Sequence, residues 1–375
     1  MILMIRNVRI NGEGEPADVL TVNGQIAQIG RKLENPFPHA EVIDGDGASA
    51  IPGYIDQHVH VTGGGGEGGF KYQVPGIRVS DIVSAGVTTL VGLLGTDGTT
   101  RSVENLVAKV KGLKEEGLTA YCLTGAYEYP SPTITGSVKK DIAFIDEVIG
   151  VKIAISDHRC SNISKRDLIR LASEARLGGV LANKPGIVHM HIGRGKKKLD
   201  DVFDILKTED IPIQVFRPTH VGGIFDDAIR FANLGGYIDF TADPEGKKTA
   251  GQLVKAFSLA PKENITLSTD SNGSFPKWNE KKELIGMSAG KITNLHQVIR
   301  CLVQDYQIPL AEAIRVSTEN VAKALKLYPR KGVLREGSDA DLLLLDSDCR
   351  IDTVVAKGAV MMKNKKVLKK GVFEE

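Results

Sequence analysis

Imidazole and carboxylate side chains that follow short apolar runs point to metal chemistry. His58 and His60 are separated by one residue, and side chains at that spacing on a strand lie on the same side, so both rings can reach one cation. His191, His220 and Asp270 each follow a further apolar run. An isolated His-x-His pair is more often two packed core residues. The convergence of four imidazoles and a carboxylate on expected strand ends favours a bound metal instead.

Two other residues near these runs have more than one interpretation. Lys152 lies in the short apolar run Val151–Ile155, an unfavourable place for a free ammonium. A neutral lysine amine can add CO₂ to form a carbamate whose two oxygens could bridge two cations, but from the residues alone a salt bridge or a strand-end position is the preferred interpretation. His189 repeats the His-x-His spacing with His191, and we expect it to pack beside the site rather than to bind metal.

A glycine-rich segment follows the first histidine pair. Residues 63–69 are six glycines and Glu67. Such a run is ordinarily a flexible connector, and it lacks the lysine and helix start of a phosphate-binding loop. We expect its backbone to approach a ligand closely, with Glu67 facing the pocket and suited to a substrate ammonium. Arg159 can hold a carboxylate through two parallel hydrogen bonds, although a surface ion pair is its default role.

Between residues 51 and 330, apolar runs alternate with helical patterns. The expected strands are Ile51–Ile55, Thr89–Leu94, Ala120–Thr124, Val151–Ile155, Ile187–Ile192, Ile211–Phe216, Tyr237–Phe240 and Ile265–Ser268. Val103–Leu113 has apolar residues at helical spacing, and Ser164 begins a capping box. Eight buried strands alternating with helices predict an α/β fold of the (β/α)₈ TIM barrel type, whose chemistry lies at the strand C-termini. A doubly wound sheet is the alternative, which no G-x-G-x-x-G motif supports.

The two ends of the chain have a different pattern of short strands and turns. Val19–Val22 and Gln25–Ile29, for example, flank Asn23-Gly24 as in a hairpin. We therefore expect a small β-sandwich domain built from residues 1–50 and 331–375. The barrel domain, residues 51–330, is inserted between these two segments.

The composition argues against some classes of binding partner and indicates the cellular compartment. The 375 residues include 48 Lys or Arg and 46 Asp or Glu, so the net charge of +2 argues against binding to nucleic acid or to a membrane surface. The four cysteines form no C-x-x-C pair, which is typical of a reducing compartment. No apolar run approaches the ~18 residues of a membrane span, and the N-terminus lacks the features of a leader. We expect a cytoplasmic protein.

Longer stretches of the chain resemble the isoaspartyl dipeptidases of the amidohydrolase superfamily. The resemblance begins with Ile51–His60 and the glycine-rich loop 63–69. It continues through Gly95–Gly98, Val151–Arg159, Pro218–Val221, Ser268–Ser274 and Gly337–Leu342, and so covers essentially the whole chain. The His-x-His pair marks only the superfamily, whereas the loop with Glu67 and the Ser-Asp-His-Arg stretch ending at Arg159 are more specific.

This resemblance implies a binuclear metal centre, with zinc as the expected metal. One cation is expected on His58, His60 and Asp270, and the other on His191 and His220. Carboxylated Lys152 is expected to bridge the two, so the resemblance makes the carbamate the favoured interpretation of this lysine. The implied activity is hydrolysis of β-aspartyl dipeptides by a metal-bridging hydroxide, with Asp270 transferring the proton, in a homo-oligomeric enzyme.

The resemblance also implies substrate contacts. These are Glu67 for the α-ammonium, Arg159 for an α-carboxylate, Thr96 and Ser274 as polar contacts, and Tyr127 for the oxyanion. One departure stands out: the family pattern has a carboxylate-binding arginine three residues after the sixth-strand histidine, where this chain has Gly223. We expect Arg217, at the same strand end, to compensate, unless the substrate itself differs.

Two other functions remain open from the sequence. One is a different amidohydrolase, such as a dihydroorotase-like cyclic amidase or an N-acyl amino-acid deacylase. The other is a non-catalytic homologue that serves as an assembly module. A non-catalytic homologue is expected to have lost metal ligands, and every expected type of ligand is present here.

Overall fold

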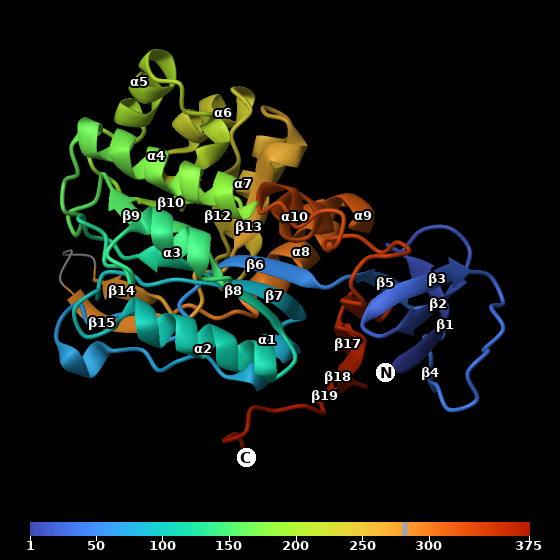
Figure 1. Cartoon of the computed structure of the whole chain (residues 1–375). Helices are drawn as coiled ribbons and strands as arrows, with labels where there is room; N and C mark the ends of the chain where they lie inside the picture. Colours follow the sequence, from blue (N-terminus) through green and yellow to red (C-terminus); the bar gives the residue numbers. More distant parts are fainter. Residues whose placement is uncertain (280–283) are drawn as a thin grey trace.

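The computed structural model describes residues 1–279 and 284–375, and its centre is an eight-stranded parallel barrel (Figure 1). The strands follow one another around the sheet in chain order. They are β6 (Tyr54–Val59), β7 (Val87–Gly92), β8 (Thr119–Gly125), β9 (Val148–Ile155), β10 (Ile187–Ile192), β11 (Phe216–Thr219), β12 (Ile238–Thr241) and β13 (Ile265–Ser268). Almost every strand residue is buried, as expected for parallel strands covered by helices.

The barrel closes where its first strand meets its last. The Thr269 hydroxyl donates a hydrogen bond to Asp56, and the chain just after β13 makes a parallel bridge from Ser271 to Val59. Asp56 also accepts from the Thr269 and His58 backbone amides, 3.2 Å away in both cases. Burial raises the pKa of Asp56 to about 7, which these hydrogen bonds only partly offset. We call this junction of β6 and β13 the seam.

Helices surround the barrel, as Figure 1 shows. The α-helices are α1 (Val79–Ser84), α2 (Val103–Glu115), α3 (Val138–Phe144), α4 (Lys165–Ala182), α5 (Asp200–Thr208), α6 (Phe225–Asn233), α7 (Lys247–Phe257), α8 (Asn294–Gln304), α9 (Leu310–Ala313) and α10 (Glu319–Ala324). Short 3₁₀ turns are η1 (Phe70–Tyr72), η2 (Ile213–Val215), η3 (Val221–Gly223), η4 (Lys262–Asn264) and η5 (Ile314–Ser317). No helix within the described residues is long and apolar enough to cross a membrane.

The two helices predicted from local pattern are confirmed. In α2, the buried residues are Val103, Leu106, Val107, Val110 and Leu113, which are the apolar positions of the sequence pattern. In α4, the Ser164 hydroxyl accepts a hydrogen bond from the Asp167 amide at 3.1 Å and so caps the helix start.

Strands from both chain ends form one mixed sheet beside the barrel. They are β1 (Ile2–Ile10), β2 (Ala17–Val22), β3 (Gln25–Gly30), β4 (Glu41–Asp44), β5 (Ser49–Pro52), β16 (Leu342–Leu345), β17 (Ile351–Ala356), β18 (Ala359–Lys363) and β19 (Lys366–Val367). The hairpin around Asn23-Gly24 is β2–β3, as predicted. β5 pairs in parallel with β1 and antiparallel with β16, so it joins the N-terminal and C-terminal strands. We propose that this sheet and the barrel are two domains that meet near Gly53.

Two predicted strands differ from those observed. The expected strand Ile51–Ile55 is divided at Gly53, because β5 ends at Pro52 in the terminal sheet and β6 begins at Tyr54 in the barrel. The expected strand Ile211–Phe216 is wrong. Residues 213–215 form η2 after Pro212, and β11 runs from Phe216 to Thr219 instead. β11 contains Pro218, which has no N–H to donate and therefore obscures the strand in the sequence.

A hairpin, β14 (Ser274–Trp278) and β15 (Leu284–Ala289), follows the last barrel strand. In Figure 1 this hairpin lies at the lower left of the barrel, on the opposite side from strands β1–β5 of the terminal sheet. Its first residue, Ser274, lies four positions after Asp270, so the hairpin begins at the strand end that carries this carboxylate.

Candidate active site

Both histidines of β6 meet the carboxylate that follows β13. The Nε2 atoms of His58 and His60 lie 3.2 Å and 3.0 Å from the same oxygen, Oδ1 of Asp270. His58 is fully buried and His60 almost so. Burial, together with nearby Lys152, lowers the pKa of His58 to about 3, so this ring is neutral at physiological pH. A neutral imidazole offers a lone pair, which is the form that binds metal.

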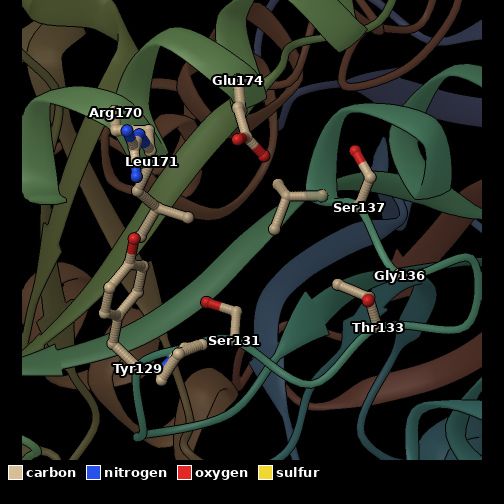
Figure 2. A pocket seen from close by; sticks show the side chains of 10 residues that line it. Tyr129, Ser131, Thr133, Gly136, Ser137, Arg170, Leu171 and Glu174 are labelled. Carbon is tan, nitrogen blue, oxygen red and sulfur yellow. The ribbon is translucent and has the colours of Figure 1, made fainter.

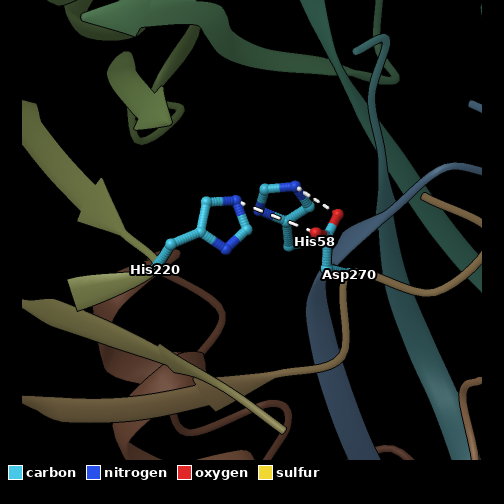
Figure 3. Close-up of side chains that lie close together, drawn as sticks. All are labelled: His58, His220 and Asp270. Carbon is cyan, nitrogen blue, oxygen red and sulfur yellow. Dashed lines mark ion pairs between the residues drawn. The ribbon is translucent and has the colours of Figure 1, made fainter. Parts of the chain in front are cut away.

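His220 completes this group of donors (Figure 3). His58, His220 and Asp270 offer nitrogen and oxygen atoms that all lie within 4.8 Å of one another. The Nε2 atom of His220 is buried, has no hydrogen-bond partner among the described residues, and lies 3.9 Å from Oδ2 of Asp270. Its Nδ1 lies 2.7 Å from the Thr241 hydroxyl, which fixes the ring. These donors fit a divalent metal, since imidazole nitrogens and carboxylate oxygens are its usual ligands.

The backbone turns at the strand ends that carry two of these donors. His220 and Asp270 have positive φ values of 62° and 54°, in the left-handed region. Histidine and aspartate enter this region more readily than most residues, although at a conformational cost. The turn bends the chain away from the strand direction at the residue that carries the candidate metal donor.

Glycines pack closely around the His60 ring. A Cβ atom at Gly95 would lie 2.8 Å from Cε1 of His60, and one at Gly273 would lie 2.7 Å from Oδ1 of Asp270 and 3.0 Å from Cδ2 of His60. Side chains at either position would push the imidazole or the carboxylate out of place. These two glycines therefore help to set the geometry of the donors.

Lys152 is fully buried among the histidines. Its Nζ lies 3.3 Å from Nε2 of His58 and above the Tyr127 ring, 5.6 Å from its centroid. No ion pair to Lys152 occurs among the described residues. Burial lowers the pKa of this lysine to about 7, so a substantial fraction of its side chain is a neutral amine at neutral pH.

His191 lies beside His220, but both of its nitrogens have other partners. The two ring centroids are 4.6 Å apart. Nδ1 of His191 lies 2.7 Å from the Tyr127 hydroxyl, and Nε2 lies 2.9 Å from Oδ2 of Asp157. Arg159 also donates two hydrogen bonds to Asp157, so this carboxylate is held from two sides. Hydrogen bonds from His191 and Arg159 lower the pKa of Asp157, outweighing the opposite effect of burial.

Three of the predicted substrate contacts converge on a fourth, Glu67. Its Oε1 accepts hydrogen bonds of 2.9 Å from the Thr96 hydroxyl and from Nη1 of Arg159, and its Oε2 accepts one of 2.6 Å from the Ser274 hydroxyl. These hydrogen bonds lower the pKa of Glu67 although burial opposes them, so the carboxylate is ionised at neutral pH. The Glu67 and Arg159 side chains are 22% and 23% exposed, which leaves both accessible to a small charged ligand.

The glycine-rich loop folds back on its own chain. A Cβ at Gly63 would lie 1.8 Å from the Val74 carbonyl oxygen, and one at Gly65 would lie 2.4 Å from that of Tyr72. Both glycines also have positive φ values. The sequence predicted that the loop backbone approaches a ligand closely. At Gly63 and Gly65 the backbone instead packs closely against residues 72–74 of the same chain. The fold-back presents Glu67 to Thr96 and Ser274.

Arg217 lies outside this group, contrary to the prediction that it replaces the missing arginine. Its side chain is fully buried, and it donates hydrogen bonds to Oε1 of Gln57 at 3.4 Å and to the Ala324 carbonyl at 3.2 Å. It also stacks over the Tyr237 ring. Because Ala324 ends α10, away from the strand ends that carry the histidines, these contacts give Arg217 no access to a substrate carboxylate.

Replacing Arg217 with methionine is expected to affect stability and leave substrate affinity unchanged. The Gln57 amide and the Ala324 carbonyl would each lose a donor, at about 1–3 kcal/mol for a buried group left unpaired. Thermal unfolding followed by circular dichroism measures the first effect, and KM for a dipeptide measures the second. A marked rise in KM with unchanged stability would return Arg217 to the substrate site.

Position 223 itself is open. A Cβ at Gly223 would have no neighbour within 4 Å, and the residue is exposed at the end of η3. An arginine side chain would fit there sterically, so the absence of one is not imposed by packing.

A separate hollow of about 220 Å³ lies between the loop after β8 and α4 (Figure 2). Tyr129, Ser131 and Thr133 line it from the loop, and Arg170 and Glu174 from the helix. It contains none of the histidines or predicted substrate contacts. We assign it no part in the chemistry.

One residue of the site was not predicted: Asp157, whose Oδ2 lies 2.9 Å from Nε2 of His191. Asp157 belongs to the polar stretch Ser156–Arg159, which directly follows β9. A carboxylate at a strand end is a signal that could have identified it. His189 was expected to pack beside the site, and its Nε2 lies 2.9 Å from Nδ1 of His58. The sequence does not show that His189 contacts His58, nor that the contact is made to its Nδ1 atom.

Comparisons with known proteins identify relatives of this architecture. Residues 244–372 match the model of the Amidohydrolase family. A beta-aspartyl dipeptidase from Fervidobacterium islandicum AW-1, solved in complex with beta-Asp-Leu dipeptide, is 39% identical, covers 98% of both chains and superposes with a TM-score of 0.92. A 5'-deoxyadenosine deaminase from Methanocaldococcus jannaschii is 25% identical over 92% of this chain and 86% of the relative.

A local match also occurs. A dihydroorotase from Mycobacterium tuberculosis is 49% identical over 67 residues, but these cover only 18% of this chain and 15% of the relative. The similarity to the Fervidobacterium protein, in contrast, combines high identity with full length. On that evidence the chain is a hydrolase of the amidohydrolase superfamily, and within it the chain belongs to the beta-aspartyl dipeptidase family.

Proposed function

We propose that this protein is a metal-dependent dipeptidase that hydrolyses β-aspartyl dipeptides. The observation that carries the proposal is the position of Glu67, an ionised and partly exposed carboxylate, beside Arg159, whose Nη2 lies 3.2 Å from Nε2 of His191. A substrate ammonium can pair with Glu67, and a substrate carboxylate can pair with Arg159. Full-length similarity to a beta-aspartyl dipeptidase that binds beta-Asp-Leu supports this choice of substrate.

We propose that His58, His60 and Asp270 hold one cation. We propose that His220 and His191 hold a second, for which His191 would give up one of its two contacts, with Tyr127 or with Asp157. Lys152, placed 3.3 Å from Nε2 of His58, is the group positioned to bridge them once its amine adds CO₂ and loses a proton to form a carbamate. Zinc suits this combination of imidazole and carboxylate ligands. When bound, such cations lower the pKa of water to about 7 and polarise a carbonyl oxygen.

The residues of the chain supply the remaining steps. Asp270 can accept the proton of the attacking water and deliver it to the leaving amine, since its Oδ1 lies at the centre of the donor group. The Tyr127 hydroxyl, now 2.7 Å from Nδ1 of His191, can donate a hydrogen bond where negative charge develops on the carbonyl oxygen. Burial, with Asp270 adding to it, raises the pKa of Tyr127, so the hydroxyl keeps its proton.

The proposal is tested by comparing β-Asp-Leu with α-Asp-Leu as substrates of the zinc-loaded protein. We expect hydrolysis of the β-linked dipeptide alone. Dihydroorotate and N-acetyl amino acids form the comparison panel. Cleavage of either in preference to β-Asp-Leu would replace the proposal with a cyclic amidase or deacylase, and no turnover of any substrate by fully metallated protein would favour a non-catalytic role.

Glu67→Gln is expected to weaken binding of β-Asp-Leu. The amide keeps hydrogen bonds to Thr96 and Ser274 but no longer offers the charge that pairs with an ammonium, so KM should rise by about 10- to 100-fold with a smaller change in kcat. Steady-state kinetics on β-Asp-Leu measure both constants. Thr100→Val, on the neighbouring loop, is the control. An unchanged KM in Glu67→Gln would mean that the ammonium binds elsewhere.

A further inference from the structure

His189 is fully buried and contacts a candidate metal ligand directly. It lies on β10, two residues before His191. Its Nε2 atom lies 2.9 Å from Nδ1 of His58, and the two rings meet edge to face with centroids 4.9 Å apart. The contact therefore joins the first and fifth barrel strands through a pair of imidazoles.

The opposite nitrogen of His58 faces the candidate metal donors. Nε2 of His58 lies 3.2 Å from Oδ1 of Asp270 and 3.3 Å from Nζ of Lys152. A ring that binds a cation through Nε2 must carry its proton on Nδ1. That proton needs an acceptor, because a buried N–H without a hydrogen-bond partner is unfavourable. Among the described residues, Nε2 of His189 is the group within hydrogen-bond distance of it.

We propose that His189 is a positioning residue for the metal centre: it accepts a hydrogen bond from Nδ1 of His58 and so holds the His58 lone pair toward the cation. This inference rests on the proposed metal-dependent function. Metal-bound histidines usually donate their second N–H to a carboxylate, a carbonyl or water, and such partners fix the ring and raise its basicity. Here a second imidazole takes that role.

The other side of the His189 ring distinguishes this role from packing alone. Its Nδ1 atom is buried and has no hydrogen-bond partner among the described residues. An apolar side chain would fill the same space without an unpaired nitrogen, so packing does not account for an imidazole here. The hydrogen bond to His58 does account for it. Nε2 accepts while the ring proton sits on Nδ1, and the cost of leaving that N–H without a partner among the described residues is offset by holding His58 in the tautomer that binds metal.

The experiment measures the affinity of metal-free protein for Zn²⁺, by competition with a chelating dye, in three variants. His189→Leu should weaken Zn²⁺ binding by about 10- to 100-fold, the usual effect of removing such a partner. His189→Gln, whose side-chain oxygen can accept the same hydrogen bond, should recover most of the affinity. His296→Leu is the matched control: His296 is also buried, between Tyr54 and the Cys349 carbonyl, and its loss should lower stability but leave Zn²⁺ affinity unchanged.

Wild-type affinity in His189→Leu would overturn the inference, and so would equal losses in the Leu and Gln variants, which would indicate a packing role. If His189→Leu does not fold, nitrogen-15 NMR of zinc-loaded wild-type protein decides. We expect a protonated Nδ1 on His58 with a scalar coupling across the hydrogen bond to Nε2 of His189. An unprotonated Nδ1 would overturn the inference. Because none of these readouts uses a substrate, they can succeed even if β-Asp-Leu proves not to be hydrolysed.

Discussion

Removal of divalent cations by a chelator is expected to abolish hydrolysis of β-Asp-Leu while leaving the barrel folded. Burial lowers the pKa values of His58, His191 and His220, so none of these rings is an acid or base at neutral pH. Without a cation, Asp270 is the group left to take a proton from water, and its lowered pKa makes it too weak a base to do so at a useful rate. The strands are held independently, by ladder pairing and by the seam. Circular dichroism and residual activity, followed by addition of Zn²⁺, measure the two effects.

Asp270→Asn tests the carboxylate within the same experiment. It is expected to lower kcat by about a thousandfold even in excess zinc, because an amide cannot accept the proton of water. Asp239→Asn is the matched control. Asp239 is also a fully buried carboxylate of the barrel, but it accepts from Gln57, Thr219, Thr266 and Ser268 rather than from the histidines. Turnover by protein that measurably lacks metal would contradict the metal-dependent mechanism.

Lys152→Ala is expected to cause a loss of similar size, on the order of a thousandfold in kcat. The substitution removes the amine beside His58 and leaves a cavity in a fully buried place. A short carboxylate such as propionate can enter that cavity and place two oxygens where the carbamate would lie. Activity should therefore return as propionate is added.

Lys152→Met is the control, because its side chain fills the space and excludes propionate. We expect it to be inactive and not rescued. Incorporation of carbon-13-labelled CO₂ into wild-type protein, observed by NMR as a carbamate signal, provides an independent measurement. An active Lys152→Met, or a wild-type protein that is fully metallated and active with an unmodified amine, would refute the bridge.

Local chemistry explains which parts of the fold could be predicted from the sequence. The periodicity of Val103–Leu113 and the cap at Ser164 depend on neighbouring residues, so α2 and α4 follow from them. His58 and His60 share a side because strand spacing requires it, and both reach Asp270. β11 was missed because a proline lies within it and apolar residues precede it.

The orientation of individual side chains depends on contacts that no local pattern records. Arg217 lies three residues before His220 and yet faces Gln57 and Ala324. Arg217 is within β11, whereas His220 follows the strand and itself has a left-handed backbone conformation. The pairing of His189 with His58 joins residues 131 positions apart. Such contacts exist only once the barrel has closed.

The seam has a consequence for the newly made chain. His60 and Asp270 are 210 positions apart, so most of the chain must have been synthesised and have left the ribosome before these two groups can meet. A nascent or truncated polypeptide that ends before β13 has His58 and His60 but not Asp270, and it lacks the segment that bridges to β6 at the seam. Hydrolytic competence is thus a property of the finished molecule, and fragments left by interrupted synthesis or proteolysis should be inert.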